Sequence, residues 1–339
     1  MRLIKQIGVI WSTLEKWFQL RRLHIPMAIL IIVITLICVF QPDYRILRQL
    51  SNQTALILVI WLVLGVGFLM LRSKRLALVC LSSCALLCLH LKNASNISLA
   101  APQVLVNKNS GFTISHFNLS SLQDNLEEDL QKIEELKPDI LVFQEFTPQF
   151  QDQIISHFDT IYSDYTEYLR MDDYGQAIFT SFPVLTKDTF LIYNIPVVRL
   201  RFQIRDGRIV QLISHYNLPP ITTKYKEDSK LVFSQLGDFI SQAGEPVIYM
   251  GTLNYVSWDN DLVRFRYEAD LNDSRKSFFP SLSNNQKSLF DAPVDHIYYN
   301  NFLDCIQFKK IENGSNKKIG IRGEYQISNN EEIYTPAQE

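Results

Sequence analysis

The chain has 339 residues, enough for one large domain or two ordinary ones, with 47% hydrophobic residues and a formal net charge of −2. The charge is divided unevenly, because residues 1–100 hold 11 Lys and Arg against two acidic residues, whereas residues 101–339 hold 22 basic and 33 acidic residues. A basic and apolar first segment suits the cytoplasmic leaflet of a membrane. The acidic remainder repels phosphate backbones at long range, which disfavours long nucleic acids as partners.

Three apolar runs without Lys, Arg, Asp or Glu lie in the first segment, at residues 25–40, 55–71 and 76–91. Each is near the short limit for crossing a bilayer. Three runs in succession, with no small-residue cleavage pattern after the first, argue against a secretory signal. The sequence therefore predicts three transmembrane helices within residues 25–91, which serve as an anchor because no acidic or strongly basic group inside them could carry transport.

Basic residues predict how these helices are oriented. They precede the first run and fill the turn Arg72–Arg75 between the second and third, and such residues favour the cytoplasmic side. The N-terminus is then cytoplasmic and the C-terminal domain extracytoplasmic, which in a Gram-negative bacterium means the inner membrane and the periplasm. Residues 1–24 have an apolar stripe typical of an interfacial amphipathic helix, and the Asn- and Ser-rich residues 92–110 predict a linker.

The acidic part alternates strand-like and helix-like patterns from about Gly111. Period-two or short apolar runs predict strands at 112–117, 140–143, 197–204, 208–214 and 247–250, and amphipathic patterns predict helices at 122–136 and 225–240. Lys137-Pro138-Asp139 supplies a helix stop, and Asp206-Gly207 favours a tight hairpin turn. This mixture of hairpins and strand-helix units predicts an α/β domain of two packed sheets covered by helices.

Polar side chains follow the predicted strands where a sheet edge would open into a cleft. They are Asn118, Gln144 with Glu145, His215, Asn254, and the pair Asp295-His296 that opens the apolar run 297–299. Singly each signal is weak, because Asn and Asp commonly end strands and a lone His is usually a hydrogen-bonded structural group. Their recurrence at five strand ends predicts a functional site.

The order and spelling of these motifs resemble the endonuclease/exonuclease/phosphatase superfamily, of DNase-like fold, across about residues 111–325, which leaves 326–339 as a tail. The matching pieces are Phe117-Asn118, Phe143-Gln144-Glu145, Tyr174-Gly175-Gln176-Ala177-Ile178 with Phe182-Pro183, Ser214-His215 with Pro219, Gly251-Thr252-Leu253-Asn254, Asn272-Asp273 and Val294-Asp295-His296. The resemblance implies a four-layer α/β sandwich, in which two mixed sheets are flanked by helices.

The resemblance also implies hydrolysis of a phosphodiester or phosphomonoester that depends on a divalent metal. Glu145 would hold Mg²⁺ or Mn²⁺ with Asn118 and Asp295 beside it, since such oxygen ligands suit a hard cation. The remaining residues would act on the phosphate: His296 would stabilise it, Asp273 would orient that imidazole, and His215 and Asn254 would contact its oxygens.

The chain departs from the family pattern at Thr252, where Gly-Asp-x-Asn has an aspartate that positions or deprotonates water. Losing a general base costs roughly 10² to 10⁴ in rate. In one interpretation the domain remains a hydrolase, in which water activated by the cation or a carboxylate such as Asp259 or Asp261 compensates. In the other it binds a phosphorylated ligand or a protein partner without chemistry. A purely structural domain would leave the ordered motifs unexplained.

The substrate is the least determined point, because the family spans nucleases, sphingomyelinases and inositol phosphatases and a fold alone does not choose among them. The acidic charge argues against long DNA. The anchor makes a lipid headgroup or another envelope phosphodiester the expected kind of ligand.

Overall fold

The computed structural model describes residues 21–95, 110–122, 125–275, 293–314 and 317–328. The chain forms two compact units, Met1–Ser95 and Asn96–Glu339. The expected interfacial helix, apart from its last residues, most of the expected linker and the end of the expected tail lie outside the described residues. The two units are a helical unit and a globular α/β unit, and each is described by itself.

The helical unit contains four described helices: α2 (Arg21–Phe40), α3 (Arg45–Ser51), α4 (Thr54–Met70) and α5 (Lys74–Ala94). Helix α5 packs against both α2 and α4, and Trp61 Nε1 donates a hydrogen bond to Thr35 Oγ1 at 3.1 Å between α4 and α2. Segments Leu23–Phe40 and Lys74–Ala94 are long and apolar enough to cross a membrane, whereas α3 and α4 meet that test only together, as a pair bent by 63°. An apolar anchor is thus supported by two helices, and the third span stays a prediction.

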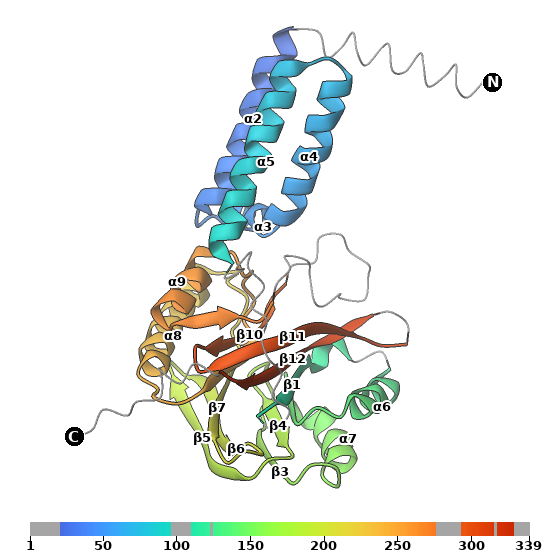
Figure 1. Cartoon of the computed structure of the whole chain (residues 1–339), viewed down its shortest axis with the longest axis vertical. Helices are drawn as coiled ribbons and strands as arrows, with labels where there is room; N and C mark the ends of the chain where they lie inside the picture. The colour runs from blue at the N-terminus through green and yellow to red at the C-terminus, as the bar shows by residue number, and fades with distance from the viewer. Residues whose placement is uncertain (1–20, 96–109, 123–124, 276–292, 315–316, 329–339) are drawn as a thin grey trace, which may run out of the picture. The chain divides into compact units, whose positions relative to one another are not determined.

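The globular unit consists of two stacked mixed sheets of six strands each (Figure 1). The first sheet has the order β11-β12-β1-β2-β4-β3, and its strands are β1 (Phe112–Asn118), β2 (Ile140–Gln144), β3 (Asp164–Tyr168), β4 (Gln176–Thr180), β11 (Leu303–Glu312) and β12 (Lys318–Ile327). The second has the order β5-β6-β7-β8-β10-β9, and its strands are β5 (Val184–Ile192), β6 (Ile195–Gln203), β7 (Ile209–His215), β8 (Val247–Thr252), β9 (Leu271–Asp273) and β10 (Asp295–Asn300).

Helices cover the outer faces of both sheets. Figure 1 shows α6 (Leu126–Leu136) and α7 (Pro148–Phe158) on one side of the unit, and α8 (Thr223–Ser241) and α9 (Asn260–Glu268) on the other. One buried apolar cluster fills the space between the sheets. A second lies between the β5–β9 sheet and helices α8 and α9, and a third lies between the other sheet and helices α6 and α7. The expected α/β architecture, two stacked mixed sheets flanked by helices, is confirmed.

Local chemistry explains most element boundaries. Helix α6 ends at Leu136 because Lys137 adopts a left-handed conformation (φ 44°) and Pro138 follows. It begins at Leu126 rather than near residue 122, because residues 119–121 form a 3₁₀ turn in which the Asn118 side chain accepts from Ser120 N. Strand β12 continues to Ile327, two residues beyond the expected domain end.

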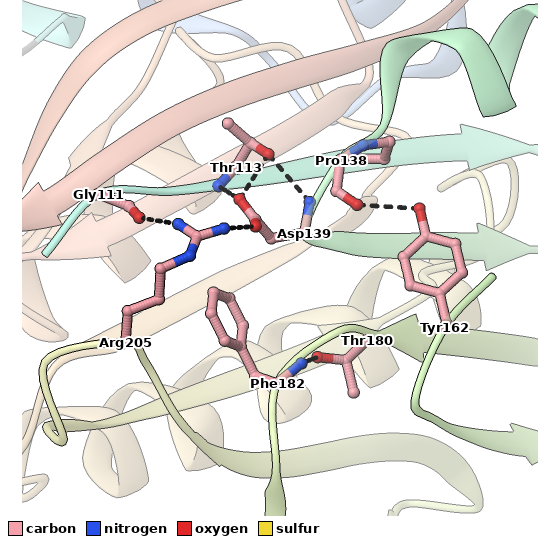
Figure 2. Close-up of polar contacts among 8 residues, drawn as sticks. All are labelled: Gly111, Thr113, Pro138, Asp139, Tyr162, Thr180, Phe182 and Arg205. Atoms are coloured by element: carbon pink, nitrogen blue, oxygen red, sulfur yellow. Dashed lines mark hydrogen bonds and ion pairs between the residues drawn. The ribbon is translucent and has the colours of Figure 1, made fainter. Parts of the chain in front are cut away.

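A polar clamp joins the two sheets at the start of β1 and β2 (Figure 2). Asp139 Oδ2 accepts from Thr113 N at 2.8 Å and from Thr113 Oγ1 at 2.9 Å, while its other oxygen pairs with Arg205 from the β6–β7 hairpin. Arg205 also donates to Gly111 O at 2.9 Å, and its guanidinium lies over the ring of Phe182. We call Thr113, Asp139 and Arg205 the clamp.

Strand directions place the polar motifs at the opposite end of the sandwich. β1 runs parallel to β2, and β7 runs parallel to β8, so the C-terminal ends of these four strands share one edge. β10 is antiparallel to β8, with Asp295 opposite Thr252, so its first residue lies at that same edge. The topology therefore gathers side chains that are far apart in the sequence.

Candidate functional site

A chain of hydrogen bonds joins two carboxylates across this edge. Asn118 Nδ2 donates to Glu145 Oε1 at 2.7 Å and to Thr252 Oγ1 at 3.3 Å, and Thr252 Oγ1 donates to Asp295 Oδ1 at 2.6 Å. Asn118 ends β1, Glu145 follows β2, Thr252 ends β8 and Asp295 begins β10. The structure thus brings together all three expected metal ligands and the residue that departs from the family pattern.

Burial makes the negative charge of both carboxylates costly. It raises the pKa of Asp295 to about 6, against the lowering effect of the Thr252 hydrogen bond and Arg275. Burial also raises the pKa of Glu145, partly offset by hydrogen bonds from Asn118, Ser120 and Tyr216. Asp295 Oδ2 is buried and has no hydrogen-bond partner among the described residues. Two destabilised carboxylates at one edge are what a cation would stabilise.

Two of the expected site residues have a strained backbone. Glu145 (φ 58°) and Asn254 (φ 57°) lie in the left-handed region, which non-glycine residues seldom occupy. Such conformations persist only where the surrounding structure enforces them, and they cluster at functional sites. Both side chains are half-buried at the edge, whereas the strand residues around them are buried.

His215 ends β7 and is fully buried. Its Nδ1 and the Tyr249 hydroxyl are hydrogen-bonded at 2.8 Å, while its Nε2 has no partner among the described residues. Burial lowers the pKa of His215 to about 3, so the ring is neutral. A neutral imidazole with one unused nitrogen is able to donate or accept one hydrogen bond to a ligand.

Tyr216 belongs to the site, although the sequence motifs do not single it out. It is 3% exposed, and burial and the neighbouring Glu145 carboxylate raise the pKa of its hydroxyl, with Asn254 acting in the opposite direction. The ring packs edge-on against Tyr174 at 5.9 Å between centroids. In the sequence, only its position directly after His215 hints at a role in the site. This hint is weak, because an aromatic residue at that position would equally suit the hydrophobic core.

His296 has a different set of contacts from the one expected. Its Nε2 donates to Tyr255 O at 2.8 Å, and its Nδ1 lies 3.5 Å from Ser257 Oγ. Asp273 Oδ1 accepts instead from Arg275 N at 2.8 Å. The structure therefore does not bring Asp273 to the His296 ring, and both ring nitrogens of that histidine already have partners.

A buried hydrogen-bond network around Gln144, which we call the relay, lies next to the site residues and was not predicted. Gln144 Oε1 accepts from Thr252 N at 2.6 Å and from His116 Nε2 at 3.1 Å, and Gln144 Nε2 donates to Ser214 Oγ at 3.2 Å. Ser214 donates in turn to Gln176 at 2.5 Å. Strands of both sheets are tied together directly beneath Glu145 and His215, so the relay fixes the spacing of the site.

The two carboxylates proposed as substitutes for the missing aspartate make their described contacts elsewhere. Asp259 caps α9 by accepting from Asp261 N at 3.0 Å. The Asp261 carboxylate lies 3.4 Å from Lys230 Nζ and 4.0 Å from Lys226 Nζ. Neither contact leads to Thr252. Within the described residues, no group of three or more His, Cys, Asp and Glu side chains is placed to hold a metal ion.

Comparison with known proteins identifies the family of the chain. The model of the endonuclease/exonuclease/phosphatase family matches residues 115–310. The chain belongs to that family. The matched region runs from β1 into β11 and includes every expected site residue. No curated protein sequence matches the chain.

Solved structures of family proteins share the fold at low sequence identity. Humanized D. rerio TDP2 with 14 mutations has 14% identity and a TM-score of 0.53, over 64% of this chain and 99% of that chain. ANGEL2, a 2′,3′-cyclic phosphatase, has 11% identity and a TM-score of 0.53, over 64% and 96%. An endonuclease/exonuclease/phosphatase from Beutenbergia cavernae has 11% identity and a TM-score of 0.52, over 65% and 72%. At this identity the likeness shows the phosphoesterase fold of the globular unit.

Proposed function

We propose that the globular unit is a metal-dependent phosphoesterase-like domain that binds a phosphate ester at the Glu145–Asp295 edge, with hydrolysis weakened by Thr252. The observation that carries this proposal is the continuous hydrogen-bonded chain from Glu145 through Asn118 and Thr252 to Asp295. It places two desolvated carboxylates at the end of the sandwich where the family motifs converge.

The donors present fit a divalent cation, Mg²⁺ or Mn²⁺. Asp295 Oδ2 is buried and has no partner in the described part of the chain, and the raised pKa of both carboxyls means that a nearby positive charge would lower the energy of their ionised forms. The cation would hold and polarise the phosphate of the ligand. Asn118 Oδ1 already accepts hydrogen bonds from Ser120 N and Ser120 Oγ. In this conformation Asn118 holds Glu145 through its amide nitrogen, and its oxygen would have to leave Ser120 to bind a cation.

Other residues would bind the phosphate directly. His215 offers its Nε2, which has no hydrogen-bond partner in the segments that the structure describes, and Asn254 is held at the half-buried edge with its Nδ2 donating to Asn217 O at 2.7 Å. Tyr216 would orient Glu145 and Asn254 through its hydroxyl. The roles proposed for His296 and Asp273 require His296 to exchange its contact with Tyr255 O for the ligand and Asp273 to replace Ser257 Oγ at the other ring nitrogen.

A second candidate function is binding without turnover, and the Thr252 contact favours it. The threonine hydroxyl donates its proton to Asp295, so it neither accepts a proton from water nor adds charge at the edge. The pocket would then capture a phosphorylated ligand or a protein partner that presents one.

We further propose that the N-terminal helices anchor the domain in a membrane and that the domain faces away from the cytoplasm. Basic residues of the expected cytoplasmic side support the orientation, and Arg72 and Lys74 flank the turn between α4 and α5. A phosphorylated lipid headgroup is the ligand that an anchored domain meets most often. The acidic charge of the globular part disfavours long nucleic acids.

The test is a hydrolysis assay of the full chain in detergent with phosphodiester and phosphomonoester substrates, Mg²⁺ or Mn²⁺, and the variants Thr252→Asp and Glu145→Ala. For a weakened hydrolase we expect slow metal-dependent turnover that Glu145→Ala abolishes and that Thr252→Asp raises roughly 10²-fold or more. Turnover in Thr252→Asp alone would identify the binding function. Turnover that Glu145→Ala leaves unchanged would contradict the site.

A further inference from the structure

The loop between β3 and β4 exposes apolar side chains directly beside the site. Phe146 N donates to Gly175 O at 3.0 Å, and a Cβ on Gly175 would lie 1.9 Å from Phe146 O. The end of the loop is therefore packed against the backbone that follows Glu145. The same loop carries Leu169 and Met171, and Met171 is 86% exposed.

The hairpin between β5 and β6 adds a second exposed group at the same end of the sandwich. β6 begins at this end, because it pairs there with His215, the last residue of β7. β5 runs beside β3, to which it is joined by a hydrogen bond from Lys187 Nζ to Asp164 Oδ1 at 2.6 Å (Figure 1). Both strands run toward the site, so the hairpin lies next to the β3–β4 loop. It exposes Leu191 and Tyr193.

The segment from β7 to α8 supplies the third group. It is joined to the site by Asn217 N, which donates to Thr252 O at 3.0 Å. Ile221 is 52% exposed in this segment, and Tyr225 is exposed in the first turn of α8, where its N donates to Thr222 Oγ1 at 3.2 Å. The three groups form what we call the apolar rim, which consists of Leu169, Met171, Leu191, Tyr193, Ile221 and Tyr225.

The apolar rim has the character of an interaction surface. Single exposed apolar side chains are normal on a protein, but a group of them beside a site marks a surface that contacts something else. The three segments that carry the rim have no net charge, because Arg170 and Lys224 balance Asp172 and Asp173. This end of an acidic domain is therefore not repelled by an anionic surface as the rest of the domain is.

The chain itself indicates what covers the rim. Ser95 ends the described helical unit and Ser110 begins the described part of the globular unit, and the residues between them, 96–109, reach about 50 Å at most. A domain held so close to its anchor meets the bilayer surface at a high effective concentration. Aliphatic side chains enter the acyl boundary of a bilayer and tyrosines lie at the level of its headgroups, which matches the composition of the rim.

We propose that the apolar rim docks on the bilayer that holds the anchor, so that the Glu145–Asp295 edge takes its phosphate ester from a lipid of that bilayer. This inference rests on the proposed function and deepens it, because it names the ligand as the phosphate of a membrane lipid and the rim as the surface that reaches it. With the rim in the acyl boundary, the edge beside it reaches the headgroup phosphates without extracting the lipid.

The test is hydroxyl-radical footprinting of the full chain, one copy per nanodisc of phosphatidylethanolamine and phosphatidylglycerol, with oxidation measured by mass spectrometry. We expect Met171 and Tyr193 to be oxidised at least fivefold more slowly in the natural chain than in the double variant Leu191→Asp, Ile221→Asp, whose charges oppose insertion. Tyr267 is the internal reference. It is 89% exposed and precedes β9, which begins at the clamp end of the sandwich, so its oxidation should be equal in both.

Leu231→Asp is the matched control, because it adds the same charge to an exposed leucine in the middle of α8 and should keep the protection. A lipid that carries a diazirine in its acyl chain should crosslink to the peptides that contain Met171 or Tyr193. Equal oxidation of Met171 in the natural chain and the double variant, loss of protection in Leu231→Asp, or protection without lipid crosslinks would each overturn the docking surface.

Mn²⁺ binding separates a failure of the rim from a failure of the site. The double variant should bind Mn²⁺ as the natural chain does, because neither substitution touches the Glu145–Asp295 edge. Mn²⁺ binding without protection of the rim would refute the docking surface alone. Protection without Mn²⁺ binding in the natural chain would refute the proposed function and with it the capture of a lipid phosphate. Melting temperatures identify any variant that is misfolded.

Discussion

The two ends of the sandwich differ in how completely the oxygens of their carboxylates are hydrogen-bonded. At the clamp end, Asp139 is bonded to Thr113 N, Thr113 Oγ1 and Arg205, so both carboxylate oxygens have donors. At the site end, Asp295 Oδ2 and His215 Nε2 are buried without partners among the described residues. Both ends are built from strand termini of the same two sheets, so topology alone does not explain the difference.

The difference indicates which end is built for stability and which for a ligand. Buried polar groups are almost always paired, and each exception in a native structure calls for an explanation such as a catalytic role or a bound ion. Strain supports the same division, because Glu145 and Asn254 adopt left-handed backbone conformations at the site end. The following predictions either break or sharpen this contrast, from the largest effect to the smallest.

The largest effect is expected from a methyl group at Gly251. Its φ is +154°, and a Cβ there would lie 1.9 Å from His215 O and 2.7 Å from Gln144 Nε2. Gly251→Ala should therefore destabilise the domain by about 4 kcal/mol or prevent folding, because a main-chain oxygen cannot move aside cheaply. Urea unfolding of the full chain in detergent, followed by tryptophan fluorescence, measures the change.

Gly207→Ala at the clamp-end hairpin is the matched control. Gly207 has φ +89°, and its nearest neighbour would lie 3.7 Å from the added Cβ, so only the backbone preference is lost. We expect a cost of about 1 kcal/mol. Equal losses for the two alanine variants would show that the site end is packed no more tightly than the hairpin.

Removal of the clamp carboxylate should have the next largest effect. Asp139→Ala leaves Thr113 N and the Arg205 guanidinium without their acceptor, and the free energy of unfolding should fall by about 3 kcal/mol. The same unfolding assay measures the loss, and Asp206→Ala on the exposed turn of the β6–β7 hairpin serves as its control. A loss under roughly 0.5 kcal/mol, which is ordinary for a surface substitution, would refute the clamp.

Removal of the site carboxylate should have the opposite sign. The pKa of Asp295 is raised in the folded state to about 6, so ionisation opposes folding. Its favourable contribution is present below the unfolded pKa and is lost as the pH rises from about 4 through 6. With chelator present at pH 7.5, Asp295→Asn should be about 2 kcal/mol more stable than the natural chain, and at pH 4 the two should be nearly equal. A less stable variant at pH 7.5 would show that Asp295 is a structural group like Asp139.

The sequence predicted the architecture well because strand and helix patterns are local. The helix stop at Lys137-Pro138, the Asp206-Gly207 hairpin and the parallel strands that end at Asn118 and Gln144 all follow from nearby residues. The family assignment is confirmed by the match over residues 115–310. Strands β3, β4, β5, β9, β11 and β12 and helices α7 and α9 were not predicted. Strand β5 shows one reason, because this edge strand is largely exposed and lacks a clear apolar period.

Contacts between distant residues were harder to predict. The family motifs predicted that Asn118, Glu145, Thr252 and Asp295 lie close together. The contact of His296 with Tyr255 O could not be predicted, because it depends on the conformation of the loop between β8 and α9. Tyr216 and His116 looked like ordinary core residues, and only the structure shows that Tyr216 lies beside Glu145 and that His116 is hydrogen-bonded to Gln144.

The central claim is that the Glu145–Asp295 edge is a divalent-cation site. The most direct measurement is the binding of Mn²⁺ to the full chain at pH 7.5 by electron paramagnetic resonance, with melting temperature recorded in parallel. We expect saturable binding with a rise in melting temperature, because a cation that binds only the folded state stabilises it, and both effects should disappear in Asp295→Asn and Glu145→Ala. Mn²⁺ binding that persists in both variants, or none in the natural chain, would contradict the account.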